Sequence, residues 1–291
     1  MAGQTADQHI CMTKSATPTI VISTAPFFRQ PVRDALRAIA EAGFEAVEVM
    51  VTQDPDTQDP APLGALTRSF GLRVAAVHAP FLIVTRRVWT PDPVEKIRRA
   101  ARLAEGVGAP LVVVHPPYRW QASYRRWVAE ELIPFSQGSG VTVAVENMFP
   151  IRVPGMPPAR FHDERRESAD GAPSQVLDTS HAAVSGVDIR TVFDRNRDRI
   201  RHIHLSNNAG KGWDSHLPLG QGGVLPVDEF LADLAAGFTG TVSLELDLRA
   251  WMRDERALHD LLVGQREYCE QRLSAGRRAP RRPRTPRARK D

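Results

Sequence analysis

The sequence has few of the residues that build disulfide frameworks or membrane spans. Its 291 residues include only two cysteines, Cys11 and Cys269, which give neither a disulfide framework nor a thiolate metal site. No apolar run approaches the roughly 20 residues needed to span a bilayer, and the first residues lack the basic start and apolar core of a secretory signal. We therefore expect a cytoplasmic protein with no membrane partner, in which histidines and carboxylates hold any metal.

Positive charge is concentrated at the carboxyl terminus. The net charge is +4, but residues 277–291 contain eight basic residues and one acidic residue, so residues 1–276 carry −3. A segment of arginine and proline without apolar residues cannot form a core, and we expect residues 276–291 to be a disordered basic tail. The tail could bind nucleic acid or another polyanion. We favour a solubilising role, because no aromatic residues are interleaved for base stacking.

Short segments rich in valine and isoleucine alternate with longer amphipathic segments. This order is typical of parallel strands joined by crossover helices, and strands that are apolar throughout belong in a sheet covered on both faces. The chain is long enough for one barrel of roughly 250 residues. We expect an α/β fold, a (β/α)8 TIM barrel over residues 18–275, preceded by a flexible leader at 1–17. The expected strands are Thr19–Ser23, Ala46–Val51, Arg73–Val77, Leu111–Val114, Val141–Val145, Ser174–Leu177, Ile200–Leu205 and Thr241–Leu244.

Amphipathic segments between these strands predict the helices. Gly43 and Gly71 follow two of them, where a left-handed residue ends a helix, and Pro93 and Pro226 lie at helix starts. Residues 149–173 contain many prolines and predict a long loop that could cover the mouth of the barrel or hold substrate. The expected helices are Val32–Ala42, Leu63–Phe70, Pro93–Gly106, Tyr124–Phe135, Ile189–Arg197, Val227–Ala236 and Asp254–Leu273.

Ionisable residues occur at the carboxyl ends of six consecutive expected strands. Active sites of this fold are built at that end, so these side chains should converge. Histidine and carboxylate together suit Zn or Mn, and Co or Mg is also compatible. His202, in contrast, is expected to face the helices and to be structural. The strand-end residues are His78, His115, Glu146, Asp178, His204 and Glu245, and Asn147, His181, Asp214 and His216 follow closely on the same rim.

A structural interpretation competes with the metal site. A single histidine in a strand is more often a hydrogen-bonded core residue than a ligand, and a carboxylate at a strand end is more often a helix cap. The number of such residues favours the metal site. Several charged groups cannot share a desolvated mouth unless a cation or protons offset them.

At these residues the sequence resembles the xylose isomerase-like TIM barrel superfamily, from about Thr19 to Leu273. The segment HIHLSNNAGKGWDSHLPLGQGGVLP resembles a stretch shared by many members. The superfamily includes sugar phosphate isomerases and epimerases, and the resemblance to them implies one divalent ion held by Glu146, Asp178, His204 and Glu245. It also includes the endonuclease IV type of AP endonucleases, whose nine ligands hold three zinc ions. Counterparts of all nine are present: His78, His115, Glu146, Asp178, His181, His204, Asp214, His216 and Glu245.

The resemblance implies a divalent-metal-dependent isomerase or epimerase that acts on a small sugar, sugar phosphate or polyol through an enediolate. Glu146 and Glu245 would move the proton, and His181 would polarise substrate oxygens. Asn147, His216 and Lys211 would bind the substrate. The alternative is a zinc-dependent AP endonuclease, in which nucleic acid is the partner. A degenerate barrel retained as a binding module, and a homodimer, also stay open.

Overall fold

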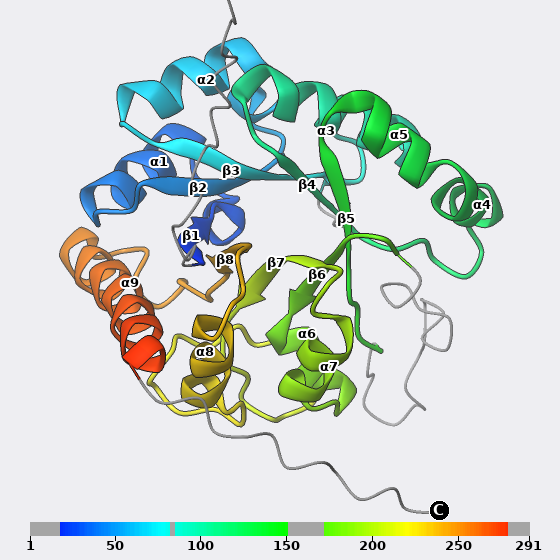
Figure 1. The fold of residues 1–291 in the computed structure, drawn as a ribbon. Coiled ribbons are helices and arrows are strands. Elements are labelled where there is room, and N and C mark those ends of the chain that lie inside the picture. Colours follow the sequence, from blue (N-terminus) through cyan, green and yellow to red (C-terminus); the bar gives the residue numbers. More distant parts are fainter. Residues whose placement is uncertain (1–17, 82–84, 151–171, 279–291) are drawn as a thin grey trace, which may run out of the picture.

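The strands form one closed parallel barrel in sequence order (Figure 1). The structure is a computed structural model and describes residues 18–81, 85–150 and 172–278. The barrel closes where β1 pairs with β8, with Thr19 opposite Thr241 and Ile22 opposite Leu244. The TIM barrel fold predicted from the alternation of segments is therefore confirmed. The strands are β1 (Thr19–Ser23), β2 (Ala46–Met50), β3 (Arg73–His78), β4 (Leu111–Val114), β5 (Thr142–Glu146), β6 (Gln175–Asp178), β7 (Ile200–Leu205) and β8 (Thr241–Leu244).

Helices surround the barrel and cover the outer face of the sheet (Figure 1). Their apolar sides and the outward-facing strand residues form one continuous buried core. No described helix is both long and apolar enough to cross a membrane. The α-helices are α1 (Val32–Glu41), α2 (Pro60–Ser69), α3 (Pro93–Val107), α4 (Ala122–Glu130), α5 (Leu132–Ser139), α6 (Thr179–Ser185), α7 (Ile189–Asn196), α8 (Val227–Ala235) and α9 (Glu255–Arg278), and short 3-10 helices lie at η1 (Ala25–Phe27) and η2 (Pro55–Thr57).

Three helical details differ from the expectation. The single helix expected over Tyr124–Phe135 is two helices, α4 and α5, because Pro134 has no backbone N–H to donate to the carbonyl of Glu130. Helix α6, directly after β6, was not expected, and α9 continues to Arg278, into the segment expected to be a tail. The leader at 1–17, most of the loop at 149–173 and residues 279–291 lie outside the described residues.

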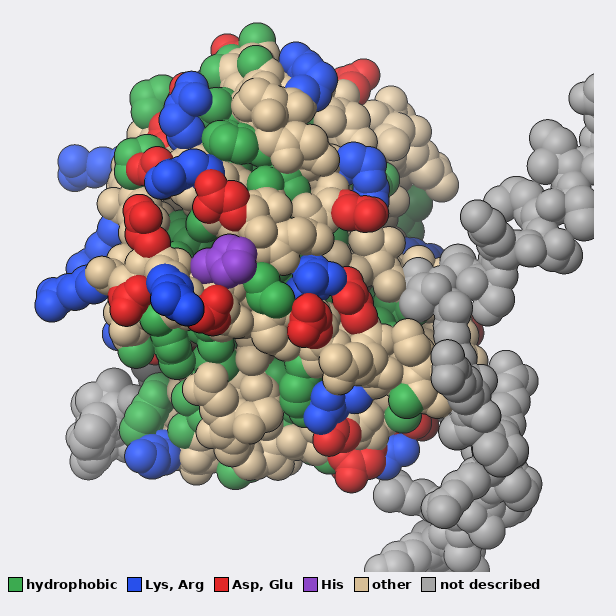
Figure 2. Space-filling model, turned by 90° about the vertical axis from the view of Figure 1, so that its left-hand side faces the viewer, with side chains coloured by type: hydrophobic (Ala, Val, Ile, Leu, Met, Phe, Trp, Pro, Cys, Tyr) green, Lys and Arg blue, Asp and Glu red, His purple; other side chains and the backbone are tan. Residues whose placement is uncertain are grey.

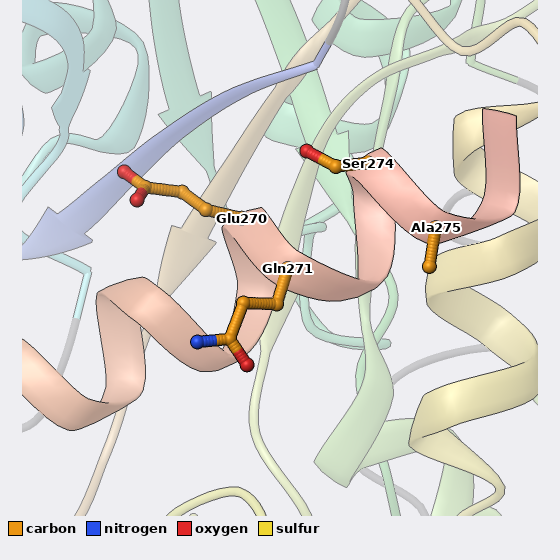
Figure 3. Close-up of a pocket in the computed structure, with 4 residues that line it drawn as sticks. All are labelled: Glu270, Gln271, Ser274 and Ala275. Atoms are coloured by element: carbon orange, nitrogen blue, oxygen red, sulfur yellow. The ribbon is translucent and has the colours of Figure 1, made fainter. Parts of the chain in front are cut away.

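Among the described residues, the groups of histidine and carboxylate side chains that could hold a metal ion are those at the barrel mouth and inside the barrel. On the side where α1 and α9 lie, acidic and basic side chains are intermixed (Figure 2). A shallow hollow on α9 is lined by Glu270, Gln271, Ser274 and Ala275 (Figure 3). Because the helices run antiparallel to the strands, this end of α9 lies at the opposite end of the barrel from the mouth. The chemistry of the described residues is therefore concentrated inside the barrel.

Candidate metal centre

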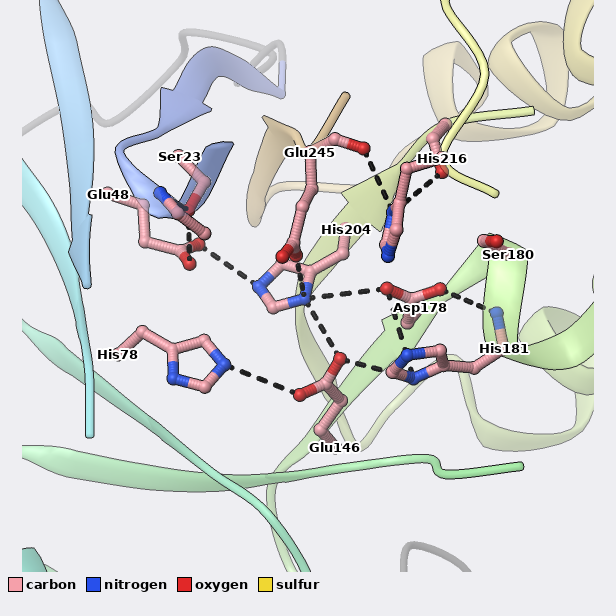
Figure 4. A network of polar contacts seen from close by, with 12 residues as sticks. Ser23, Glu48, His78, Glu146, Asp178, Ser180, His181, His204, His216 and Glu245 are labelled. Carbon is pink, nitrogen blue, oxygen red and sulfur yellow. Dashed lines mark hydrogen bonds and ion pairs between the residues drawn. The ribbon is translucent and has the colours of Figure 1, made fainter. Parts of the chain in front are cut away.

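The six expected strand-end residues meet inside the carboxyl end of the barrel. Figure 4 labels five of them, and the sixth, His115, lies beside Glu146. His78, Glu146 and Asp178 are the last residues of β3, β5 and β6, so all three lie at the carboxyl end of the barrel. His115 and Glu245 follow β4 and β8 directly, and His204 lies one residue before the end of β7. Parallel strands of one barrel end at the same rim, which brings together residues that are far apart in the sequence.

The central group consists of Glu146, Asp178, His204 and Glu245. The Nδ1 atom of His204 lies 3.0 Å from Oε1 of Glu146 and 3.0 Å from Oε2 of Glu245. Oδ2 of Asp178 lies 3.7 Å from the same nitrogen. One potential ligand atom from each of the four residues lies within 4.8 Å of every other. Three carboxylates therefore surround one imidazole nitrogen.

The central group fits a divalent cation. Among the described residues, the buried Oε2 of Glu146 and Oδ2 of Asp178 have no hydrogen-bond partner. Buried carboxylate oxygens without partners are costly. Oδ2 of Asp178 faces the central group, 3.7 Å from Nδ1 of His204, where a cation would satisfy it, whereas Oε2 of Glu146 faces His78 and His115. Burial raises the pKa of Asp178 to about 6, which shows how poorly its negative charge is compensated. Imidazole and carboxylate ligands suit Zn, Mn, Co or Mg.

Protonated histidines supply positive charge to this group when no cation is bound. Burial alone would lower the pKa of His204, but the carboxylates of Glu48, Glu245 and Glu146 raise it well above its usual value. Burial alone would raise the pKa of Glu146, yet its histidine neighbours, above all His204, hold it well below its usual range. The cluster therefore stabilises positive charge at its centre.

Two histidines lie close to Oε2 of Glu146, the carboxylate oxygen that does not face His204. Nε2 of His78 lies 3.5 Å from Oε2 of Glu146, and Nε2 of His115 lies 3.3 Å from the same atom. Nδ1 of His78 contacts the carbonyl of Ala79 at 2.9 Å, and the hydroxyl of Tyr124 donates to the carbonyl of His115 at 2.7 Å. The first contact fixes the ring of His78, and the second holds the backbone of His115. His78, His115 and Glu146 form a second group able to hold a cation.

A third group lies on the other side of Asp178. Oδ2 of Asp214 lies 3.2 Å from Nε2 of His181 and 2.7 Å from Nε2 of His216. Helix α6 begins at Asp178, whose Oδ1 accepts from the backbone N–H of His181. His216 has a positive φ of 41°, and its Nδ1 contacts the carbonyl of Glu245 at 3.0 Å. An unusual backbone conformation at this position is typical of a functional site.

Two residues expected to bind substrate have contacts within the protein. The side-chain amide of Asn147 donates to the carbonyl of Asp178 at 3.0 Å, and its oxygen accepts from the backbone N–H of Asp178 at 2.7 Å. Asn147 thus joins the ends of β5 and β6. The exposed Lys211 lies with Nζ 5.8 Å from the ring centre of Trp213, in the loop after β7. Substrate binding by both residues stays a prediction.

The expectation for His202 was wrong, and Glu48 was missed. His202 does not face the helices: Nε2 lies 2.5 Å from Oε2 of Glu48 inside the barrel. Residues two apart in a strand point to the same face, so His202 and His204 both project inward. Glu48 could have been found from the sequence, because it is the only charged residue in the apolar strand β2 (AVEVM).

Comparisons with known proteins agree with this architecture. The sequence profile of the xylose isomerase-like TIM barrel family matches residues 36–262. Uncharacterized protein ML2432 of Mycobacterium leprae is 33% identical over 271 residues, which cover 85% of this chain and 96% of the relative. The similarity to the relative therefore extends over nearly the whole barrel.

Solved structures share the fold at low sequence identity. IolI protein with a bound zinc atom superposes with a TM-score of 0.64 at 17% identity, covering 88% of this chain and 98% of that chain. L-ribulose 3-epimerase gives 0.62 at 17% identity, with 90% and 96% covered. An AP endonuclease, family 2, from Brucella melitensis gives 0.55 at 17% identity, with 82% and 99% covered. Together with the profile match, which spans most of the barrel, these findings show that the chain belongs to the xylose isomerase-like TIM barrel family.

Proposed function

We propose that this protein is a divalent-metal-dependent isomerase or epimerase of a small sugar, sugar phosphate or polyol. The observation that carries the proposal is the convergence of Glu146, Asp178, His204 and Glu245, one from each of the last four strands, with the buried Oδ2 of Asp178 lacking a hydrogen-bond partner among the described residues. L-ribulose 3-epimerase and IolI with its bound zinc have the same fold, which supports the reaction class and the cofactor.

The arrangement of two carboxylates suits proton transfer at carbon. Glu146 and Glu245 approach Nδ1 of His204 from two sides, each at 3.0 Å (Figure 4). A substrate seated between them would present one face to each carboxylate. One carboxylate would then remove a proton from carbon and the other would return it, by way of an enediolate of the substrate.

The divalent ion would be held by the four central residues. When bound, it would supply Lewis-acid polarisation of adjacent carbonyl and hydroxyl oxygens and lower the pKa of the carbon acid. His181 and His216 border the site and would hydrogen-bond substrate oxygens. Burial alone would lower the pKa of His181, but the carboxylates of Asp178 and Asp214 raise it well above its usual value, so this ring can donate. Lys211, on the exposed loop after β7, would contact a phosphate group.

Solvent deuterium exchange into a panel of ketoses tests the proposal. Wild-type protein loaded with Mn²⁺ or Zn²⁺ should exchange a carbon-bound proton, and Glu146→Gln and Glu245→Gln should each lower the rate by at least about 100-fold. Glu105→Gln, on the exposed side of α3, is the matched control. The ion content of each variant must be measured, because both carboxylates are also ligands. Exchange at the wild-type rate in both ion-loaded variants would contradict the proposal.

A second candidate is a zinc-dependent AP endonuclease. The observation that favours it is that nine histidines and carboxylates form three adjacent groups, centred on Glu146, on His204 and on Asp214. Hydrolysis of a phosphodiester by a zinc-activated hydroxide, with two further zinc ions on the phosphate, would require such a set of ligands. The AP endonuclease from Brucella melitensis has the same fold.

Ion counting separates the two candidates. About three tightly bound zinc ions per chain would favour the nuclease, and one would favour the isomerase. Cleavage of a duplex containing one abasic site should be measured with the full chain and with a chain that ends at Arg278. The shorter chain lacks most of the basic tail, so a difference between the two reports on the tail rather than on the metal centre.

A further inference from the structure

A second polar cluster lies deeper in the barrel than the metal centre. It consists of Glu48 from β2 and of His202 and His204 from β7, all fully buried. Oε2 of Glu48 lies 2.5 Å from Nε2 of His202 and 3.1 Å from Nε2 of His204. The hydroxyl of Ser23 donates to Oε1 of Glu48 at 3.2 Å (Figure 4). The proposed reaction does not use Glu48.

This deeper cluster is hydrogen-bonded rather than shaped for an ion. Among the described residues, no side-chain polar atom of Glu48, His202 or His204 lacks a partner, in contrast to Glu146 and Asp178. An ion such as zinc needs about 2.0 Å to each ligand atom, so two ligand atoms around it lie roughly 3 Å or more apart. The 2.5 Å separation between Glu48 and His202 is a hydrogen bond.

Glu48 accepts from three donors and needs no proton of its own. His202 and His204 each direct a ring nitrogen at Oε2, and Ser23 directs its hydroxyl at Oε1. A buried carboxylate with three donors can remain ionised, because these donors replace the water that it has lost. The pairing of β2 with β3 is irregular between Val47 and Glu48, and such irregularities re-aim side chains.

His204 connects the deeper cluster to the metal centre. Its Nε2 faces Glu48 at 3.1 Å, and its Nδ1 faces Glu146 and Glu245 at 3.0 Å each. A neutral imidazole carries one N–H, so an acceptor at Nε2 places the proton there and leaves the lone pair of Nδ1 for the ion. We propose that Glu48 is a positioning residue that fixes the tautomer and orientation of His204 for binding the ion through Nδ1.

The proposal rests on the proposed metal site but not on the identity of the reaction. Carboxylates that accept from a metal-ligating histidine typically contribute about 10–100-fold to metal affinity. Glu48 is placed to act in this way, and His202, whose Nδ1 contacts Thr241 Oγ1 at short range, holds Glu48 from the other side. Loss of Glu48 should therefore weaken binding of the ion, although all four proposed ligands are still present.

The test is zinc affinity of the full-length protein, measured by competition with a chromophoric chelator. Glu48→Leu removes the acceptor and should weaken zinc binding by about 10–100-fold with unchanged stoichiometry at saturation. Glu48→Gln keeps the shape and one acceptor oxygen, so it should retain most of the affinity. Glu45→Gln, exposed at the start of the same strand, is the matched control and should bind as the wild type does. If Glu48→Leu fails to fold, the position of the His204 proton in the wild type decides the question, because a zinc-loaded wild type without a protected proton on Nε2 would overturn the proposal.

Nitrogen NMR of the zinc-loaded protein gives a readout that a merely structural role would not change. In the wild type, His204 should show a protected proton on Nε2 and ligation through Nδ1, and this proton signal should be lost in Glu48→Leu. Wild-type zinc affinity and an unchanged His204 signal in both Glu48 variants would overturn the proposal. A wild-type protein that binds zinc but exchanges no substrate proton would contradict the proposed reaction alone, because the role of Glu48 is read from zinc binding.

Discussion

Nε2 of His216 lies 2.7 Å from Oδ2 of Asp214, two residues earlier in the loop after β7. The side chains of two residues so close in the loop can face each other because the backbone of His216 has a positive φ of 41°. Burial alone would lower the pKa of His216, but Asp214 raises it to about 9, while Asp214 itself has its pKa held below the usual value by His181 and His216 despite burial. The pair is therefore an ion pair at neutral pH when no metal is bound.

The first prediction follows from the raised pKa of His216. Its pKa in the folded chain, about 9, exceeds the usual 6.5, so its contribution to stability is complete below pH 6.5 and is lost as the pH rises through 9. The loss amounts to at most about 3 kcal/mol, and the shift of Asp214 belongs to the same interaction and is not added. Urea unfolding in the presence of a chelator at pH 6, 7.5 and 9 measures it. In His216→Gln this part of the pH dependence should disappear, and parallel profiles for the two proteins would argue against the ion pair.

The second prediction concerns metal uptake. His204 and His181 have pKa values well above the usual value, and His216 has one of about 9, so a cation must displace protons to bind. Apparent affinity for Zn²⁺ or Mn²⁺ should therefore rise from pH 6 to about pH 9, with release of protons. Calorimetry in buffers of different ionisation enthalpy counts those protons. Affinity that does not change over this range would show that the ligands are already deprotonated.

The third prediction separates the two possible roles of Asn147. Asn147→Ala removes both hydrogen bonds to the backbone of Asp178, leaves that N–H without its partner, and should lower the free energy of unfolding by about 2 kcal/mol. Asn147→Asp keeps the acceptor but sets a carboxylate oxygen against the carbonyl of Asp178 and adds a negative charge beside buried carboxylates, so its effect should be at least as large. Zinc affinity should fall in parallel with stability. A variant with normal stability and a raised KM would instead support substrate contact.

The fourth prediction tests the closing edge of the barrel. A Cβ atom at Gly240 would lie 2.3 Å from the carbonyl oxygen of Arg201 and 2.4 Å from Cζ of Phe238, just before β8. Gly240→Ala should therefore cost about 1–3 kcal/mol of unfolding free energy. A Cβ atom at Gly138, in α5, would meet no described atom within 4 Å, and alanine there should be neutral or stabilising by about 0.5–1 kcal/mol. Thermal unfolding of the two alanine variants provides the comparison, and equal melting temperatures would disprove the steric argument.

The strands and the convergence of the candidate metal ligands were predictable because their signals are local in the sequence. Each of the eight expected strands corresponds to an observed strand within one or two residues at each end. The convergence of His78, Glu146 and Glu245 follows from the fold, since strand ends of a parallel barrel share one rim. Helix α6 was missed because it has only seven residues, too few for an apolar stripe to show.

The deeper cluster was not predicted because its signal is not local. Glu48 resembles an isolated charge in an apolar strand, and only barrel closure places it beside His202 and His204, more than 150 positions later in the chain. The inward orientation of His202 could have been predicted, because side chains two residues apart in β7 lie on the same face and His204 was expected to point inward. The pairing of Asn147 with Asp178 depends on the adjacency of β5 and β6 and on side-chain rotamers, which sequence spacing does not reveal.

The order of the strands also affects how the protein is made. Glu245 follows β8, the last strand to leave the ribosome, and β8 is held in place by hydrogen bonds to β1, the first. A nascent chain interrupted before residue 241 would contain Glu146, Asp178 and His204 but neither Glu245, the fourth proposed ligand, nor the closing pair of strands β1 and β8. Under the proposed function, such a fragment would bind the ion more weakly than the closed barrel, so metal affinity would report on completion of the last strand.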